Sequence, residues 1–230
     1  MGLLSLELIV VGAGFITSLF GFSYLVKEVF IDKDESVDKQ VFEYLEQFVT
    51  PTNTAIMQGV TFFATHTFLI PANLLLAAYF LFVRKHKWYS IKVTAIALSS
   101  TAMMFLLKQF FSRQRPLIPL LESARGLSFP SGHAMMSFAF YGLLIYLTHK
   151  YVERKELKWA IIFLLLIFIL MIGFSRIYLR VHYTSDVLAG FSVGIVWLIC
   201  SIYLLNRLEN LSRKKIQPVD AEGKPTSPIV

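Results

Sequence analysis

The chain has 230 residues, of which 56% are hydrophobic and 16% are charged, and its mean hydropathy is +0.61. A soluble domain usually carries about 25% charged residues, so the composition excludes an ordinary soluble globular protein. The formal net charge of +7 does not indicate nucleic-acid binding, because the basic residues are divided among short separate clusters and form no continuous groove.

Six apolar segments are long enough to cross a bilayer, which takes roughly 20 helical residues. They are residues 3–26, 55–83, 92–111, 132–149, 158–175 and 184–205. Backbone polar groups cannot remain unpaired in lipid, so these segments are expected to be helices. We therefore predict an all-α fold, an integral membrane bundle of six transmembrane helices. One membrane domain is expected over residues 1–216, and residues 217–230 are expected to form a disordered cytoplasmic tail.

The distribution of charge predicts the topology. Short clusters of Lys and Arg follow every second span, near residues 84–92, 150–158 and 207–215, whereas residues 27–48 are mostly acidic. The positive-inside rule therefore places both termini in the cytoplasm. Within residues 33–50, apolar residues recur at helical spacing, which predicts a short outward amphipathic helix after the first span. An ordinary loop helix without a lipid role fits the same pattern.

The first chemically informative segment contains Lys108, Arg115 and Pro116. Lys108 and Arg115 are seven residues apart, which would put both cations on one face of a helix, and Pro116 would end that helix. Both could then reach a common outward site. The alternative is that they are basic side chains that extend from a span end to the membrane surface, as is common. Arg113 fits this second description better than the other two.

The second segment is Pro130-Ser131-Gly132-His133, which directly precedes a long apolar run. Ser131 is a good candidate for a helix N-cap. The backbone N–H groups of Gly132 and His133 would then lie at a helix N-terminus, where anions bind, and glycine allows an anion to approach closely. Many helices begin in this way without binding anything, so the segment is informative mainly through its histidine.

The third segment contains Ser175, Arg176, His182 and Asp186. His182 and Asp186 share a face if a helix continues through both. A carboxylate that accepts the proton on one imidazole nitrogen leaves the other nitrogen free to attack. Arg176 could bind a phosphate through two hydrogen bonds. A structural ion pair at a helix end is the alternative, but ionisable groups near a membrane are costly and usually functional.

Other kinds of site fit the sequence less well. No grouping of Asp, Glu and His has convincing metal-ligand spacing, and we interpret His66, His86 and His149 as non-catalytic. A Ser-His-Asp triad with Ser131 or Ser175 is conceivable, but it would leave the three cations without a role.

Together, the three segments resemble the type-2 phosphatidic acid phosphatase family, the membrane relatives of the vanadium haloperoxidases. The family pattern is K-x6-R-P, then P-S-G-H, then S-R-x5-H-x3-D. Every position matches, and the residues are Lys108, Arg115-Pro116, Pro130-Ser131-Gly132-His133, Ser175-Arg176, His182 and Asp186. A haloperoxidase is not expected, because those relatives are soluble.

The resemblance implies a role for each residue. His182 would be the nucleophile that forms a phosphohistidine, and Asp186 would orient it and stabilise its positive charge. His133 would protonate the departing lipid oxygen and then activate water. The phosphoryl oxygens would be held by Lys108, Arg115, Arg176, Ser131 and the amide of Gly132. Because these groups would replace the Mg²⁺ of other phosphoryl-transfer sites, neither a metal nor another cofactor is expected.

The implied function is an integral-membrane lipid phosphatase acting on a phosphate or pyrophosphate headgroup. Candidate substrates are undecaprenyl pyrophosphate, phosphatidylglycerol phosphate, phosphatidic acid and diacylglycerol pyrophosphate. The first two are preferred because the compact chain looks bacterial, which implies a cytoplasmic membrane protein with its site facing the periplasm or cell exterior. The lipid substrate and the bilayer are the expected partners, and the sequence carries no signal for an oligomeric state. Alternatives are a lipid phosphotransferase, a lipid A phosphatase and a non-catalytic lipid-binding or transport protein.

Overall fold

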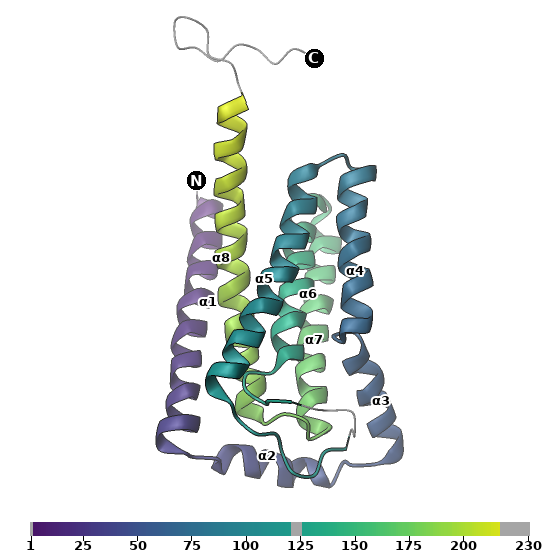
Figure 1. The fold of residues 1–230 in the computed structure, drawn as a ribbon. Coiled ribbons are helices and arrows are strands. Elements are labelled where there is room, and N and C mark those ends of the chain that lie inside the picture. The colour runs from purple at the N-terminus through teal and green to yellow at the C-terminus, as the bar shows by residue number, and fades with distance from the viewer. Residues whose placement is uncertain (1, 121–125, 217–230) are drawn as a thin grey trace, which may run out of the picture.

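The computed structural model describes residues 2–120 and 126–216, and every regular element within these ranges is a helix. The elements are α1 (Gly2–Val26), η1 (Lys27–Asp32), α2 (Ser36–Glu46), α3 (Pro51–Phe62), α4 (His66–Ala78), η2 (Tyr79–Val83), α5 (Lys87–Phe111), α6 (Gly132–Tyr151), α7 (Lys155–Tyr178) and α8 (Thr184–Ile216). The long helices form a bundle, and α2 crosses one end of it (Figure 1). The start of α1 and the end of α8 lie at the opposite end. The tail predicted at residues 217–230 lies outside the described residues.

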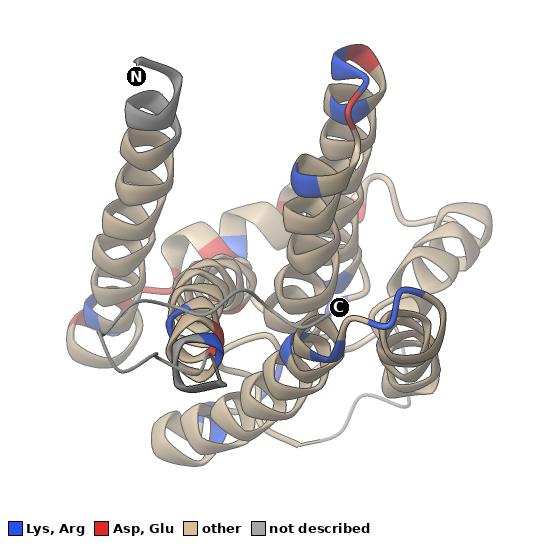
Figure 2. Cartoon of the chain, turned by 90° about the horizontal axis from the view of Figure 1, so that it is seen from above, with Lys and Arg blue, Asp and Glu red and all other residues tan. Residues whose placement is uncertain are grey.

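The all-α membrane fold predicted from the sequence is confirmed. Within the described chain, five helical segments are long and apolar enough to span a membrane: Leu8–Asp32, Pro51–Val83, Lys87–Phe111, Lys155–Tyr178 and Thr184–Arg213. Charged residues lie mainly near helix ends and in connecting segments, as the long tan stretches in Figure 2 show. The sixth predicted span is present as the helix α6, although its composition alone does not mark it as a span. The number of spans therefore stays a prediction.

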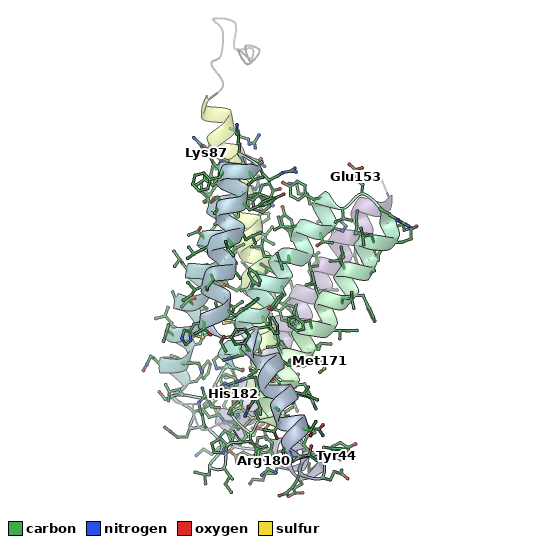
Figure 3. The ribbon with its side chains drawn as sticks, turned by 90° about the vertical axis from the view of Figure 1, so that its right-hand side faces the viewer. Tyr44, Lys87, Glu153, Met171, Arg180 and His182 are labelled. Carbon is green, nitrogen blue, oxygen red and sulfur yellow. The ribbon has the colours of Figure 1, made fainter. Side chains whose placement is uncertain are left out.

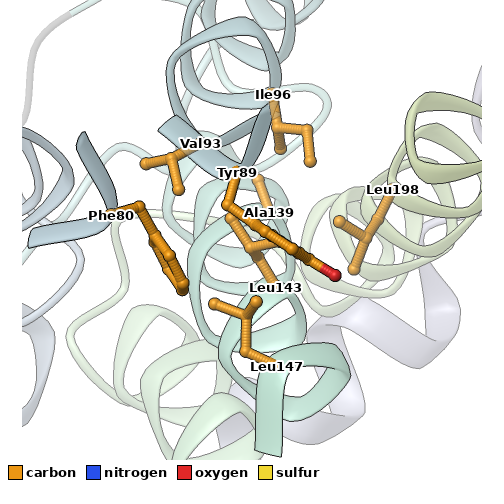
Figure 4. Close-up of a cluster of buried hydrophobic side chains, with 8 residues drawn as sticks. All are labelled: Phe80, Tyr89, Val93, Ile96, Ala139, Leu143, Leu147 and Leu198. Atoms are coloured by element: carbon orange, nitrogen blue, oxygen red, sulfur yellow. The ribbon is translucent and has the colours of Figure 1, made fainter. Parts of the chain in front are cut away.

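The weaker hydropathy of α6 follows from its position at the centre of the bundle. It packs against α5, α7 and α8, so much of its surface meets protein rather than lipid. Figure 4 shows a cluster of buried hydrophobic side chains in which α6 packs against η2, α5 and α8. The members of the cluster are Phe80, Tyr89, Val93, Ile96, Ala139, Leu143, Leu147 and Leu198. On α8, Gly190 lies so close to α6 that a Cβ there would be 2.6 Å from the carbonyl oxygen of Ser131. Glycine therefore permits the α6–α8 contact that supports the beginning of α6.

The second predicted span, 55–83, is not one continuous helix. It begins at Pro51, directly after the N-cap Thr50, and it is interrupted between α3 and α4 at residues 63–65. The hydroxyl of Tyr141 on α6 donates to the carbonyl oxygen of Phe63 at 2.8 Å, and the hydroxyl of Thr65 donates to that of Phe62 at 2.6 Å. The Tyr141 hydroxyl thus satisfies a carbonyl group that the interruption releases, as membrane-embedded backbone requires, and the Thr65 hydroxyl adds to the bond that Phe62 accepts from the Thr65 N–H.

The predicted helix within residues 33–50 is present as α2 (Ser36–Glu46). Leu45 is buried with Ala134, Ile177 and Val187, at the beginnings of α6 and α8 and the end of α7. Other apolar side chains of the segment, such as those of Val37 and Phe48, are exposed. The helix therefore packs partly on the bundle, and its placement on a membrane surface stays a prediction.

A buried ion pair joins α5 to α8 at the end of the bundle away from α2. The ammonium of Lys92 is 1% exposed and lies 2.6 Å from a carboxylate oxygen of Glu209. It also donates to the side-chain oxygen of Asn206 at 2.6 Å. Because a charge left unpaired in this environment would be costly, the three groups fix α8 against α5.

Candidate active site

The three predicted segments meet at one end of a single cavity. The cavity has a volume of about 580 Å³, and the site end is lined by Lys108, Arg115, Gly132, His133 and His182. The rest of its wall is mainly apolar and comes from α4 and α5, with side chains such as Leu69, Ala97 and Phe105. In Figure 3, His182 lies among the helices near the end marked by Arg180 and Tyr44, whereas Lys87 and Glu153 mark the opposite end. A polar site therefore opens into an apolar chamber within the bundle.

The two cations of the first segment reach this cavity by different routes. Lys108 lies in the last turn of α5, which ends because Ser112 adopts a left-handed conformation with φ of 49°. The prediction that Lys108 and Arg115 share one helical face is therefore wrong, since Arg115 lies beyond the end of the helix. Its guanidinium instead folds back and donates to the carbonyl oxygen of Val181 at 2.6 Å. The helix α5 thus places Lys108, and the loop after it places Arg115.

The second segment forms the start of α6. Ser131 occupies the N-cap position as predicted, but its side chain makes no capping hydrogen bond. Its own N–H donates to the backbone oxygen of Asp186 at 2.9 Å, which joins the segment to the start of α8. Among the described residues, Ser131 Oγ and His133 Nε2 are buried and have no hydrogen-bond partner. Buried polar atoms are normally paired, so these two atoms are suited to a polar ligand.

His182 lies in the turn before α8, and Asp186 lies in the first turn of that helix. The imidazole Nδ1 is 3.5 Å from Asp186 Oδ2 and 3.3 Å from Ser128 Oγ, and the Ser128 hydroxyl donates to the same carboxylate oxygen. On the other side of the ring, Nε2 is 3.3 Å from Arg115 Nη1. A guanidinium can only donate, so Nε2 accepts and the proton resides on Nδ1. The nitrogen with the free electron pair therefore faces the cavity.

The surroundings also set the charge of His182. Burial and the nearby positive charges of Arg115, Arg176 and Lys108 together lower the pKa of His182 well below its ordinary value. Burial disfavours a charged imidazolium, and like charges add to the effect. The ring is therefore neutral near pH 7, which is the form in which Nε2 is nucleophilic.

Arg176 and Ser175 lie at the end of α7 and are both buried. Arg176 Nη1 donates to the hydroxyl of Thr61 on α3 at 2.7 Å, while its Nε has no partner among the described residues. The Ser175 hydroxyl donates to the carbonyl oxygen of Ile172 at 2.6 Å, within its own helix. The Ser175 hydroxyl is therefore engaged within its own helix, and a triad built on it is not supported.

The interpretation of Arg113 as a surface-directed side chain is wrong. Arg113 is 9% exposed, and its Nη1 lies 2.8 Å from Asp186 Oδ1. Its Nη2 lies 3.0 Å from the carboxylate of Asp38, which is 3% exposed. Burial alone would lower the pKa of Arg113, but Asp186 and Asp38 raise it above the ordinary value. The sequence pattern does not identify Asp38 or Ser128 as part of the site, because Asp38 contacts Arg113 and Ser128 contacts Asp186 across a long separation in the chain.

Comparison with known proteins agrees with the motifs and the fold. Residues 88–209 match the PAP2 superfamily. The chain is 26% identical over 176 residues to phosphatidylglycerophosphatase B of Bacillus subtilis (strain 168). The aligned region covers 76% of this chain and 86% of that protein. It is 28% identical over 153 residues to undecaprenyl-diphosphatase BcrC of the same organism, covering 63% and 72%.

Two solved structures share the fold. A transmembrane PAP2 type phosphatidylglycerolphosphate phosphatase from Bacillus subtilis superposes with a TM-score of 0.75 at 24% identity, covering 88% of this chain and 97% of that one. Aquifex aeolicus LpxE superposes with a TM-score of 0.54 at 25% identity, covering 71% and 93%. The resemblance inferred from the motifs is confirmed, and with it the prediction of a lipid phosphatase at the level of the family. The chain belongs to the PAP2 superfamily.

Proposed function

We propose that this protein dephosphorylates a membrane lipid in two chemical steps through a phosphohistidine on His182. The observation that carries the proposal is the meeting of two cations, Lys108 and Arg115, and two histidines at the polar end of an otherwise largely apolar cavity, with the charge of Arg176 acting on His182 from nearby. Its wall can accept a lipid tail while the polar end binds the phosphate. Neither a transporter nor a structural membrane protein requires this combination.

The phosphoryl group would be bound by Lys108, Arg115 and Arg176, with the Ser131 hydroxyl and the Gly132 amide as further donors. The unpartnered Ser131 Oγ and Arg176 Nε support this assignment, because a phosphate oxygen would satisfy both. The contact between Arg115 and His182 Nε2 would be replaced by contacts to phosphate, which frees the nucleophile. Donors that are already oriented toward the transferring group stabilise its charge without reorganisation.

In the first step, His182 Nε2 attacks phosphorus. A phosphorus–nitrogen bond forms, the bond from phosphorus to the lipid oxygen breaks, and His133 gives that oxygen a proton. The attack leaves a positive charge on the imidazole, which Asp186 stabilises directly and through Ser128. In the second step, His133 accepts a proton from water, and the water oxygen attacks phosphorus. The phosphorus–nitrogen bond then breaks, its electron pair returns to Nε2, and inorganic phosphate leaves.

The cavity indicates how the lipid is held. Its lining on α5 runs from Lys108 to Thr94, a distance of about 21 Å at 1.5 Å per residue. The lining residues Ile70, Leu74, Leu98 and Phe105 are also largely exposed at the bundle surface, so a tail can enter from the bilayer between α4 and α5. Given the names of the two relatives, phosphatidylglycerol phosphate and undecaprenyl pyrophosphate are the first substrates to test.

We further propose a bacterial cytoplasmic membrane location, with both termini in the cytoplasm and the site on the outer side. The start of α1 and the end of α8 lie at one end of the bundle, and α2 lies at the other (Figure 1). The positive-inside rule assigns the end with the termini to the cytoplasm, because basic clusters flank the helix ends there.

The test is phosphate release from a panel of lipid phosphates in detergent, with EDTA present. Wild-type protein should release phosphate in EDTA, because protein cations take the place of a metal, and His182→Ala should release none. Phosphorylated lipid in place of free phosphate would indicate transfer to another lipid. Equal release by both proteins, or wild-type activity that requires an added metal, would contradict the proposed mechanism.

The pH dependence should report the charge of His182. Because burial and nearby cations lower the pKa of His182, the acidic limb of kcat/KM should lie below pH 6.5, the ordinary value for an imidazole. Arg115→Gln removes one of these charges, so the pKa should rise and the limb should move to higher pH. Arg115→Lys keeps the charge and should leave the limb in place. A limb that is unmoved in both variants would mean that another group titrates there.

A further inference from the structure

The carboxylate of Asp186 is held by different partners at its two oxygens. Oδ2 faces His182 and accepts a hydrogen bond from the Ser128 hydroxyl. It also accepts one from the backbone N–H of Tyr183 at 2.9 Å. Oδ1 accepts from Arg113 Nη1 at 2.8 Å. Asp186 is fully buried. Its orientation toward His182 therefore depends in part on Arg113, which lies at an unspecified position within the first family motif.

Arg113 is itself fixed by a helix from another part of the chain. Its second nitrogen, Nη2, donates to Asp38 Oδ2 at 3.0 Å, and its guanidinium carbon lies 4.0 Å from the centre of the Tyr183 ring. Asp38 also accepts from the backbone N–H of Ser185 at 2.9 Å and from its hydroxyl at 2.6 Å. The buried Asp38 thus connects α2 to Arg113 and to the residue directly before Asp186.

We propose that Arg113 and Asp38 are positioning residues, which orient Asp186 and through it His182. The inference rests on the proposed function, in which Asp186 holds the nucleophile. It assigns to α2 a part in the chemistry, since Asp38 lies on that helix and fixes the guanidinium that holds Asp186.

The geometry requires an arginine. One planar guanidinium binds two buried carboxylates through separate nitrogens, and it stacks on Tyr183 at the same time. A lysine has one ammonium nitrogen and cannot reproduce this bridge. Without the bridge, two buried carboxylates would lose the positive charge between them, and Asp186 would be held toward the histidine only through its other oxygen, Oδ2.

The test measures how kcat and KM change in Arg113→Gln, Arg113→Lys, Asp38→Asn and the Asp38→Asn/Arg113→Gln double variant. Arg113→Gln should lower kcat about 10- to 100-fold, the range seen when partners that orient functional histidines in metal sites are removed. KM should stay near its wild-type value, because the three phosphate-binding cations are unchanged. Arg113→Lys should also lose kcat. The double variant should lose less than the product of the two single losses, because the residues act as one unit.

The matched control is Glu46→Gln, because Glu46 also lies on α2 and pairs with an arginine, Arg180, at 3.6 Å, but outside this network. It should keep wild-type kcat, and thermal unfolding in detergent should show that each variant is folded. Wild-type kcat in folded Arg113→Gln or in Arg113→Lys, a loss confined to KM, or independent losses in the double variant would overturn the inference. If Asp186→Asn itself retained activity, the proposed function would fail instead.

Discussion

Replacing His133 by alanine is expected to slow lipid dephosphorylation about 10²- to 10⁴-fold, the usual contribution of general acid–base catalysis. His133 lines the cavity beside His182, and its Nε2 is buried without a partner in the described part of the chain. Its Nε2 is therefore free to contact the lipid oxygen, to which the proposed mechanism has it donate a proton. An aryl phosphate, whose leaving group needs no proton, should recover much of the first step.

The variant should then accumulate phosphorylated protein, because the second step still lacks its base. Incubation with a labelled aryl phosphate, followed by rapid quenching, should show an acid-labile and alkali-stable label on His133→Ala. His182→Ala should remain unlabelled with the same compound. Equal losses in the rate of phosphoprotein formation with lipid and aryl phosphates would argue that His133 serves binding rather than proton transfer, and a label on His182→Ala would identify a different nucleophile.

Filling the apolar part of the cavity is expected to separate tail binding from phosphate chemistry. Ala97 lines the cavity on α5, about 16 Å along the helix axis from Lys108 at the polar end. A tryptophan there should obstruct the path of a lipid tail, and overfilling a packed site costs about 1–3 kcal/mol, equivalent to roughly 5- to 150-fold in kcat/KM. Activity on a short water-soluble phosphate should change little, because the polar end is unaltered.

The control for this prediction is an alanine-to-tryptophan substitution on the opposite face of α5. Ala102 lies on α5 too, is exposed, and is not part of the cavity wall. Ala102→Trp should behave like wild type with both substrates. If Ala97→Trp lowered activity on the short phosphate as much as on the lipid, the effect would be general damage to the site. If it lowered neither, the tail would not occupy this cavity.

Much of the site could be predicted because its residue types are chemically unusual in an apolar chain. Lys108, His133 and His182, which the motifs single out, all line one cavity. Arg113 and Asp38 could not be predicted in this way. They are 75 residues apart, and each is surrounded by other charged residues in the sequence. A pattern in the sequence reveals a partner one or two helical turns away, but not one supplied by a distant segment.

In the fold, too, features that depend on nearby residues could be predicted, whereas a feature that depends on a distant residue could not. The long apolar runs predicted helices, and most of these formed. The interruption at residues 63–65 was not predictable, since Phe62, Phe63 and Ala64 read as a continuous apolar span. What permits it is the hydroxyl of Tyr141, which donates to a carbonyl group freed by the interruption. That donor belongs to α6, nearly 80 residues later in the chain.

The ion pair of Lys92 with Glu209 has a consequence for the distant carboxylate of Asp186. Glu209 and Asp186 belong to one continuous helix, separated by about 35 Å along its axis. A straight helix turns as a rigid rod, and a shift of one residue rotates every side chain by about 100°. By fixing the angular position of α8 at its far end, Lys92 also limits the directions in which Asp186 can project. The orientation of Asp186 toward His182 thus depends partly on a contact at the opposite end of the helical bundle.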